Sequence, residues 1–239
     1  MVISAFRYTL ADSSDAFNDV LRPLMVPLLT NMLSDRDLGN HRLALTTLNS
    51  ALHNKMNILL PHLGELLPAV FGDTHPKPEL IREVQMGPFK HKVDDGLDLR
   101  KSAYETLYAA LDTSFARSHV SELYDRIISG IEDEQDIRAI SNLMTSKLVI
   151  IAPEETERRL DALSERYTAV LSFKPKDNAV KQEIEKAQEA SLGILKISKE
   201  LSKAFPGAEA STELHKWKGY LEWVRKTFVS QFQGLDTDL

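Results

Sequence analysis

Cysteine is absent from the 239 residues of the chain. Its absence excludes disulfide bonds, thiol nucleophiles and zinc sites with cysteine ligands, and it is compatible with a reducing compartment. A chain of this length buries roughly 70–75% of the surface of its unfolded state, so it needs neither a disulfide nor a structural metal to form a core. We therefore expect a fold that apolar packing alone holds together.

An excess of positive charge is also missing, since the formal net charge is −6 and the isoelectric point is about 5.7. Proteins that bind nucleic acids usually carry a basic surface that neutralises phosphates. No window approaches the roughly 18 apolar residues of a membrane span, and the chain does not open with the basic and apolar regions of a signal peptide. We expect a soluble intracellular protein whose partners include neither a nucleic acid nor a membrane.

Catalytic signatures are missing as well. The HExxH, GxSxG, GxGxxG and Walker sequences, which position metal ligands, nucleophiles and phosphates, do not occur. No two histidines stand at zinc-ligand spacing with a third ligand nearby; the chain has His41, His53, His62, His75, His91, His119 and His215. The sequence therefore predicts a protein that is not an enzyme and that holds no metal and no cofactor.

The apolar residues that are present recur at spacings of three and four, which is typical of amphipathic helices. One such stripe is formed by Leu123, Ile127 and Ile131, and Trp217 belongs to the last stripe, where we expect it in the core. Clusters of turn residues separate the stripes at 11–15, 72–78, 174–178 and 206–211. The fold class expected is therefore all-α.

A short pattern recurs along the chain: an acidic residue, then at fixed offsets an apolar residue, a basic residue, a small residue and a further apolar residue. The copies are Asp35, Asn40, His41, Ala44 and Leu48; Asp94, Leu99, Arg100, Ala103 and Leu107; and Glu132, Ile137, Arg138 and Ser141. The first copy departs from the pattern at Asn40 and His41, where an apolar residue and arginine are expected, and the third has Ser141 in place of alanine. The pattern resembles the turn between the two helices of a HEAT repeat. There the acid caps the second helix, and the small residue lets the helices approach closely. An α-solenoid of HEAT-type helix pairs is therefore expected.

The spacing of the copies locates an insertion. From Asp94 to Glu132 it is 38 residues, near the roughly 40–47 of a HEAT unit, whereas from Asp35 to Asp94 it is 59. The excess of about 21 residues falls at 73–93. Residues 79–86 and 89–93 flank Gly87 and Pro88, and in both segments two sets of side chains alternate along the chain, as they do in strands. We therefore interpret the insertion as a projecting β-hairpin. A short helix from Pro78 to Met86 is the alternative, since proline is favoured in the first turn of a helix.

One stretch, residues 81–103, is distinctive enough to suggest a family. It resembles the carboxyl-terminal region of the cullin-associated, neddylation-dissociated (Cand) proteins, also described as TATA-binding-protein-interacting. Residues 42–55, 159–163 and 178–186 extend the resemblance, which runs from about residue 2 to about residue 205. It implies a long HEAT superhelix that wraps an unmodified cullin–RING ubiquitin ligase, in the cytoplasm and the nucleus.

The resemblance also implies a mechanism and a site. The carboxyl-terminal repeats of the family embrace the amino-terminal region of the cullin, and the hairpin excludes a Skp-type adaptor, which promotes exchange of substrate receptors. Lys92 departs from the family, where threonine is common. The partner-binding residues expected are Leu80, Arg82, Val84, Met86, Gly87, Pro88, Phe89, Lys90, His91 and Val93.

The domain organisation expected is one carboxyl-terminal HEAT segment over residues 1–239, with the hairpin at about 73–93 and terminal capping helices from about 178 onward. The chain opens inside an apolar pattern, residues 2–10, without a helix cap. We therefore expect the remainder of a longer solenoid to be missing. A HEAT-type nuclear-transport receptor or another HEAT scaffold is the alternative function, and an enzyme or a nucleic-acid-binding protein would belong to a different class.

Overall fold

The computed structural model describes residues 8, 14–87, 89–176 and 178–235. The chain divides into two compact units, Met1–Ala116 and Arg117–Leu239, and the division falls within the short helix α7 (Ser114–Ser118). Each unit has its own buried apolar core. The breaks expected between helices at 72–78, 174–178 and 206–211 are confirmed within the described residues.

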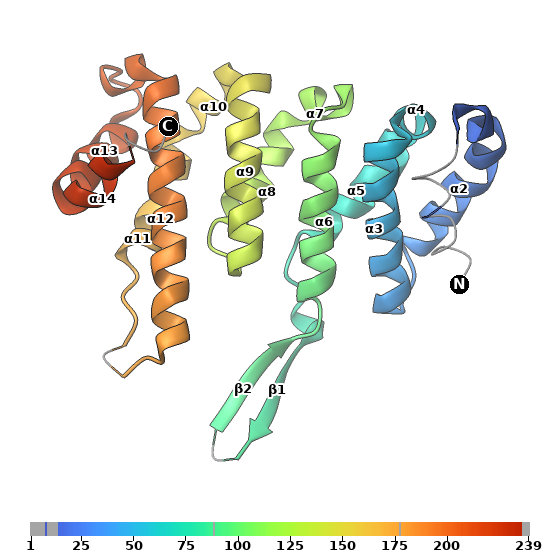
Figure 1. The fold of residues 1–239 in the computed structure, drawn as a ribbon, viewed down its shortest axis with the longest axis horizontal. Helices are drawn as coiled ribbons and strands as arrows, with labels where there is room; N and C mark the ends of the chain where they lie inside the picture. The colour runs from blue at the N-terminus through green and yellow to red at the C-terminus, as the bar shows by residue number, and fades with distance from the viewer. Residues whose placement is uncertain (1–7, 9–13, 88, 177, 236–239) are drawn as a thin grey trace. The chain divides into compact units, whose positions relative to one another are not determined.

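The first unit is built on helices that pack side by side (Figure 1). Its helices are α2 (Asn18–Met32), α3 (Leu38–Asn54), α4 (Met56–Leu59), α5 (Leu63–Asp73) and α6 (Leu97–Ala110). Helix α6 packs against both α3 and α5, and α2 packs against α3. Asp37 caps α3 by accepting a hydrogen bond from the Asn40 amide, 2.9 Å away. Ala44, Leu48 and Ala51, which are completely buried, form part of its inner stripe.

A β-hairpin connects α5 to α6. Strand β1 (Ile81–Met86) pairs antiparallel with β2 (Phe89–Asp94), and the register runs from Ile81 opposite Asp94 to Met86 opposite Phe89. Gly87 adopts φ 61°, the left-handed conformation that glycine tolerates best and that tight hairpin turns require. The hairpin prediction is thus confirmed, and the alternative helix is reduced to a single 3₁₀ turn, η3 (Pro78–Leu80).

Among its described residues, the second unit contains helices and connecting segments and no strand. Its helices are α8 (Val120–Gly130), α9 (Gln135–Ile151), α10 (Pro153–Arg158), α11 (Leu160–Ser172), α12 (Lys181–Ala204), α13 (His215–Thr227) and α14 (Val229–Gly234). Helix α9 packs against α8 and α12, and α11 packs against α13. Trp217 is completely buried, as its place on the last apolar stripe predicted.

The repeat register is reproduced in the second helix of each pair, because Ala44, Ala103 and Ser141 are all completely buried. The role expected for the acidic residues is different in detail. The carboxylate of Asp35 accepts hydrogen bonds from the backbone of Asp37 and the side chain of Asn40, while Asp37 itself is the cap of α3. The fold class is confirmed: an all-α chain of HEAT-type helix pairs with one inserted β-hairpin.

Candidate protein-interaction hairpin

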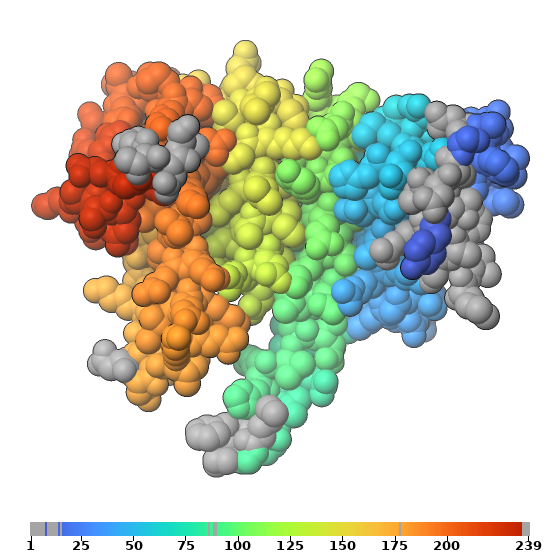
Figure 2. Space-filling model, in the orientation of Figure 1, coloured from blue at the N-terminus to red at the C-terminus, as the bar shows by residue number. Residues whose placement is uncertain are grey.

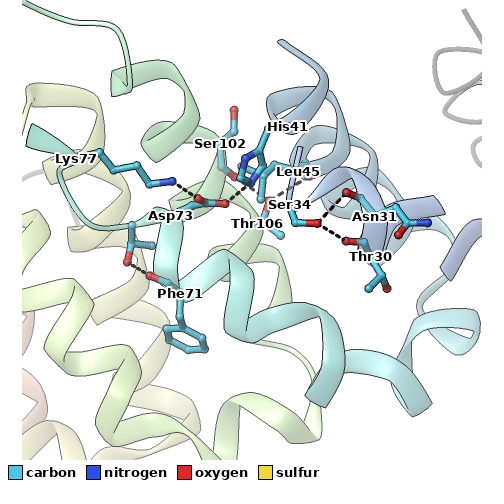
Figure 3. A network of polar contacts seen from close by, with 11 residues as sticks. Thr30, Asn31, Ser34, His41, Leu45, Phe71, Asp73, Lys77, Ser102 and Thr106 are labelled. Atoms are coloured by element: carbon cyan, nitrogen blue, oxygen red, sulfur yellow. Dashed lines mark hydrogen bonds and ion pairs between the residues drawn. The ribbon is translucent and has the colours of Figure 1, made fainter. Parts of the chain in front are cut away.

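The hairpin is anchored where the chain leaves α5. Asp73, the last residue of that helix, is buried, and its two carboxylate oxygens have different partners. His41 Nε2 lies 2.6 Å from Oδ2, and the Lys77 ammonium donates to Oδ1 at 2.8 Å (Figure 3). Removing one partner of a buried carboxylate is strongly destabilising, because the charge is left uncompensated. This contact therefore fixes the direction in which the chain departs.

A second anchor lies where the chain returns to α6. The Asp94 carboxylate accepts a hydrogen bond from the Gly96 amide at 2.9 Å and another from the buried guanidinium of Arg100, also at 2.9 Å. Leu80 packs here too, since a Cβ atom added to Gly96 would lie 2.9 Å from its Cδ1. Glycine is thus the residue that permits the close approach of the hairpin to the start of α6.

A third contact joins the two ends of the hairpin. The Arg82 guanidinium donates two hydrogen bonds to the Asp95 carboxylate, at 2.6 and 3.2 Å. These bonds lower the pKa of the Asp95 carboxyl and raise the pKa of Arg82. The Asp95 amide also donates to the Leu80 carbonyl oxygen at 3.0 Å. Both strands are therefore tied together at their base, outside the strand ladder itself.

The register sorts the side chains of the hairpin onto two faces, because directly opposed residues in an antiparallel pair share a face. One face carries Arg82 opposite Val93 and Val84 opposite His91. The other carries mostly charged and polar residues: Glu83 opposite Lys92 and Gln85 opposite Lys90, with Ile81 opposite Asp94 at its base. The Lys90 ammonium lies 3.5 Å from the Glu83 carboxylate on this second face. The hairpin is therefore amphipathic across its thickness.

The hairpin stands clear of the helices of its own unit (Figure 2). Within the described residues, the only element packed extensively against either strand is the other strand. Val84 and Val93 are half-buried, and Arg82, Gly87, Lys90 and His91 are exposed. An isolated two-stranded hairpin is only marginally stable in water, so the anchors at its base are what hold this one in place.

The structure places the predicted site residues in three groups. Arg82, Val84, Gly87, Lys90, His91 and Val93 lie along the hairpin. Leu80 does not belong to a strand; it lies in η3 and packs against Gly96 at the base. Pro88 and the side chains of Met86 and Phe89 lie outside the described part. The binding role of these residues stays a prediction.

Sequence reasoning missed the anchoring residues Asp73, Lys77 and Asp95. One signal was available, because His41 occupies the position where the repeat pattern has a basic residue. In the other two copies the basic residue bonds the segment that precedes its own helix: Arg100 donates to Asp94, the last residue of β2, and Arg138 donates to the backbone carbonyl oxygens of Ile131 and Asp133. His41 instead contacts the end of α5, the first helix of the next pair.

Among the described residues, no group of three or more acidic or histidine side chains is arranged to hold a metal ion. In the same part of the chain, no helix combines the length and the apolar character that crossing a bilayer requires. A segment of helical repeats that carries one anchored, amphipathic β-hairpin is the class of protein that this fold and this site define.

Comparison with known proteins places the chain within that class. Residues 58–225 match the family described as TATA-binding protein interacting (TIP20). The chain is 75% identical over 238 residues to the C-terminal part of cullin-associated NEDD8-dissociated protein 1 of Emericella nidulans, a match that covers 100% of the chain and 23% of the relative. The chain belongs to the TATA-binding-protein-interacting family, as the resemblance of residues 81–103 indicated.

More distant relatives are also named as cullin-associated NEDD8-dissociated proteins. Identity is 37% over 214 residues to cullin-associated NEDD8-dissociated protein 1 of Drosophila melanogaster, covering 90% of the chain and 17% of the relative. Identity is 34% over 219 residues to cullin-associated NEDD8-dissociated protein 2 of Rattus norvegicus, covering 89% of the chain and 17% of the relative. The chain thus spans less than a quarter of the length of these relatives.

Proposed function

We propose that this chain contacts a cullin and that its hairpin is the part that decides the outcome of the contact. The relatives are named for association with a cullin, and the similarity to them covers nearly all of this chain. The partner proposed is the amino-terminal region of an unmodified cullin within a cullin–RING ubiquitin ligase. The site of action proposed is the cytoplasm and the nucleus.

The observation that carries the proposal is the hairpin with its anchored base. Three contacts hold the hairpin in one direction: the ion pair of Arg82 with Asp95, the ion pair of Arg100 with Asp94, and the contacts of Asp73. Among the helices that the structure describes, none packs extensively on the face that holds Val84 and Val93. Apolar side chains presented on a projection mark a partner site more often than they arise by chance. A pre-positioned ribbon also loses little conformational entropy on binding, which favours affinity.

The mechanism proposed is competition. The hairpin occupies surface on the cullin that a Skp-type adaptor also needs, so the two cannot be fully bound together. Occupying shared surface lowers the affinity of the adaptor, and by thermodynamic linkage the adaptor lowers the affinity of this protein by the same factor. Such an exchange factor needs no catalytic group, because binding free energy alone drives the release of the substrate-receptor module.

The test measures the rate at which an adaptor dissociates from a preformed cullin complex, using the full-length protein. Residues 82–93 are replaced by Asn-Gly, a sequence that favours a tight turn, so that Asp73 and Asp94 keep their contacts. We expect the helical content and cullin binding to persist and the acceleration of adaptor release to be lost.

Two single substitutions on opposite faces give a matched comparison. Val84→Asp places a charge on the apolar face and should slow adaptor release, whereas Gln85→Asp places the same charge on the polar face and should leave the rate unchanged. Equal rates for the wild-type and hairpin-deleted proteins would show that the hairpin does not compete with the adaptor.

A further inference from the structure

Helix α9 carries exposed apolar side chains on the side opposite its core residues. The core side includes Ile137, Met144 and Leu148, which are completely buried. On the opposite side Leu143 and Ile150 are 54% and 83% exposed, and they stand seven residues apart in the sequence. Seven residues are close to two helical turns, or about 10.5 Å, so the two side chains lie on one line along the helix.

This line of apolar side chains borders α12, which packs beside α9 in the second unit (Figure 1). Two side-chain hydrogen bonds join the helices: Gln135 donates to Glu189, and Ser146 donates to Glu200 at 2.6 Å. Both bonds join residues 54 positions apart, so the two helices run parallel and in register. Ser146 lies between the two exposed apolar residues on the same side of α9, so their line runs along the junction of the two helices.

Lysines of α12 stand level with the apolar residues of α9. Lys196 and Lys203 are exposed, and they lie four residues before and three residues after Glu200, on the side of α12 that borders α9. At the offset of 54 positions, Leu143 is within one residue of the height of Lys196, about 1.5 Å along the axis. Ile150 is equally close in height to Lys203. An apolar side chain beside a lysine therefore occurs twice, two helical turns apart.

The charge around these residues is positive, although the chain has a net charge of −6. Between Leu192 and Ala204, α12 contains three lysines and one glutamate, and this Glu200 already accepts the hydrogen bond from Ser146. The part of α9 beside it, residues 143–151, contains Lys147 and no acidic residue. This end of the helix pair therefore combines exposed apolar side chains with an excess of lysine.

We propose that this surface, the α9–α12 face, binds an acidic amphipathic helix of a partner protein. The face is formed by Leu143, Ile150, Leu192, Lys196 and Lys203, all of which are exposed. Apolar residues of the partner helix lie against the leucines and the isoleucine, and acidic residues next to them form charge-assisted hydrogen bonds with the lysines. The face contains no residue of the hairpin, and the proposal holds whether or not the hairpin competes with an adaptor.

The spacing of Leu143 and Ile150 selects a helix over an extended segment as the occupant. A second helix repeats its side chains over the same two turns, so residues seven apart on the partner can contact both anchors at once. In a strand, about 10 Å corresponds to three residues, and side chains three residues apart point to opposite faces. An extended segment therefore cannot present both of its matching side chains to the α9–α12 face.

The lysines argue against a second copy of this chain as the occupant. A symmetric dimer buries the same surface of both copies, so Lys196 and Lys203 of one copy would approach those of the other. Like charges brought together across an interface are unfavourable, whereas acidic residues complement them. The charge of the α9–α12 face therefore selects a partner helix of opposite sign.

The experiment uses three synthetic peptides of about four helical turns, with leucine at every third and fourth position and with glutamate, glutamine or lysine beside the leucines. Binding to the full chain is measured by fluorescence anisotropy, and the site is mapped through isoleucine and leucine methyl groups by NMR. We expect the glutamate peptide to bind most tightly, the lysine peptide most weakly, and the methyl shifts to centre on Leu143, Ile150 and Leu192.

Substitution of an apolar anchor tests the position of the peptide. Leu143→Glu changes an exposed side chain and should weaken binding of the glutamate peptide about tenfold, a change of roughly 1.4 kcal/mol. Val180→Glu is the matched control, because Val180 is 62% exposed and lies just before α12, at the end of that helix remote from Lys203. The control should leave the affinity for the glutamate peptide unchanged.

Removal of the lysine charges tests the sign of the partner. Lys196→Gln combined with Lys203→Gln should abolish the preference for the glutamate peptide over the glutamine peptide. Lys181→Gln combined with Lys186→Gln removes two charges from exposed positions in the first two turns of α12, outside the face, and should preserve that preference.

Four outcomes overturn the proposal. The first is equal affinity for the three peptides or no binding of the glutamate peptide. The second is an equal loss of binding with Leu143→Glu and Val180→Glu, which would show that the contact is not confined to the face. The third is a dimer in sedimentation velocity that Leu143→Glu dissociates, which would make a second copy of the chain the occupant. The fourth is a tenfold gain in affinity when residues 236–239, which include two aspartates, are removed, because this segment would then be the occupant.

Discussion

Small side chains occupy equivalent positions in the second helix of three helix pairs. Ala44, Ala103 and Ser141 are each completely buried, so the offset from the preceding acidic residue predicted burial correctly in all three copies. The copies differ chemically, because Ser141 brings a hydroxyl where the pattern has a methyl group. Its Oγ has no hydrogen-bond partner within the described part of the chain. Burial of a polar group without a partner costs free energy.

Replacing this hydroxyl should therefore stabilise the protein. We expect Ser141→Ala to raise the free energy of unfolding by about 1 kcal/mol, and hence Tm by roughly 2–4 °C for a chain of this size. Ser198→Ala is the matched control, because Ser198 Oγ donates to the Ile194 carbonyl oxygen and lies 2.6 Å from the Tyr220 hydroxyl. Thermal unfolding should show a lower Tm for that control. A lower Tm for Ser141→Ala as well would contradict the prediction.

Local sequence patterns predicted the strands of the hairpin better than they predicted the helix boundaries and the contacts between helices. The alternation of side chains on either side of Gly87 was sufficient to predict the hairpin. Side chains along a strand point to opposite faces in turn, and glycine tolerates the left-handed conformation of a tight turn. The apolar spacing did not show that α4 and α5 are separated by a 3₁₀ turn, Leu60–His62, that contains a proline. The contact of His41 with Asp73 joins residues 32 positions apart. Such anchors depend on how the helices pack, which no local pattern states.

The turn of the hairpin can be tested separately from its anchors. Gly87 has a positive φ, which costs a residue with a Cβ atom about 1–2 kcal/mol. Gly87→Ala should therefore increase amide hydrogen exchange along both strands and leave the exchange of α3 and α6 unchanged. Gly64→Ala is the control, because α5 has open space around Gly64 and alanine favours a helix there. Unchanged exchange of the strands in Gly87→Ala would show that the anchors alone determine the stability of the hairpin.

At the scale of the whole molecule, the periodic pattern predicted repeated helix pairs, but it did not predict the division into Met1–Ala116 and Arg117–Leu239. The division is a property of contact density, to which every helix contributes, and it falls inside α7 rather than at a glycine-rich or proline-rich linker. The uncapped apolar segment 2–10, on which the expectation of a longer solenoid rested, lies outside the described residues apart from Tyr8. The next helix along the chain, α2, is described, and its exposed apolar side chains can be examined instead.

Helix α2 carries a second apolar stripe besides the one it buries. Phe17, just before the helix, and Val20 and Leu24 within it are 54%, 58% and 57% exposed and stand three and four residues apart. In repeat proteins each unit covers the flank of its neighbour, and an uncovered flank exposes apolar surface. This chain spans less than a quarter of its curated relatives. The stripe on α2 is thus the surface through which copies of the isolated chain are expected to meet.

We predict weak self-association of the isolated chain that depends on this stripe. Sedimentation velocity should show a weight-average mass that rises with concentration, and Leu24→Glu should return it to that of the monomer. Asn31→Glu places the same charge at an exposed position of the same helix and should leave the association intact. This control distinguishes the effect of the added charge on association from the effect of the lost apolar contact. Burial of apolar surface contributes about 25 cal/mol per Å² to the free energy of association. A chain that stays monomeric at every concentration would show that the stripe on α2 is already covered within the protein.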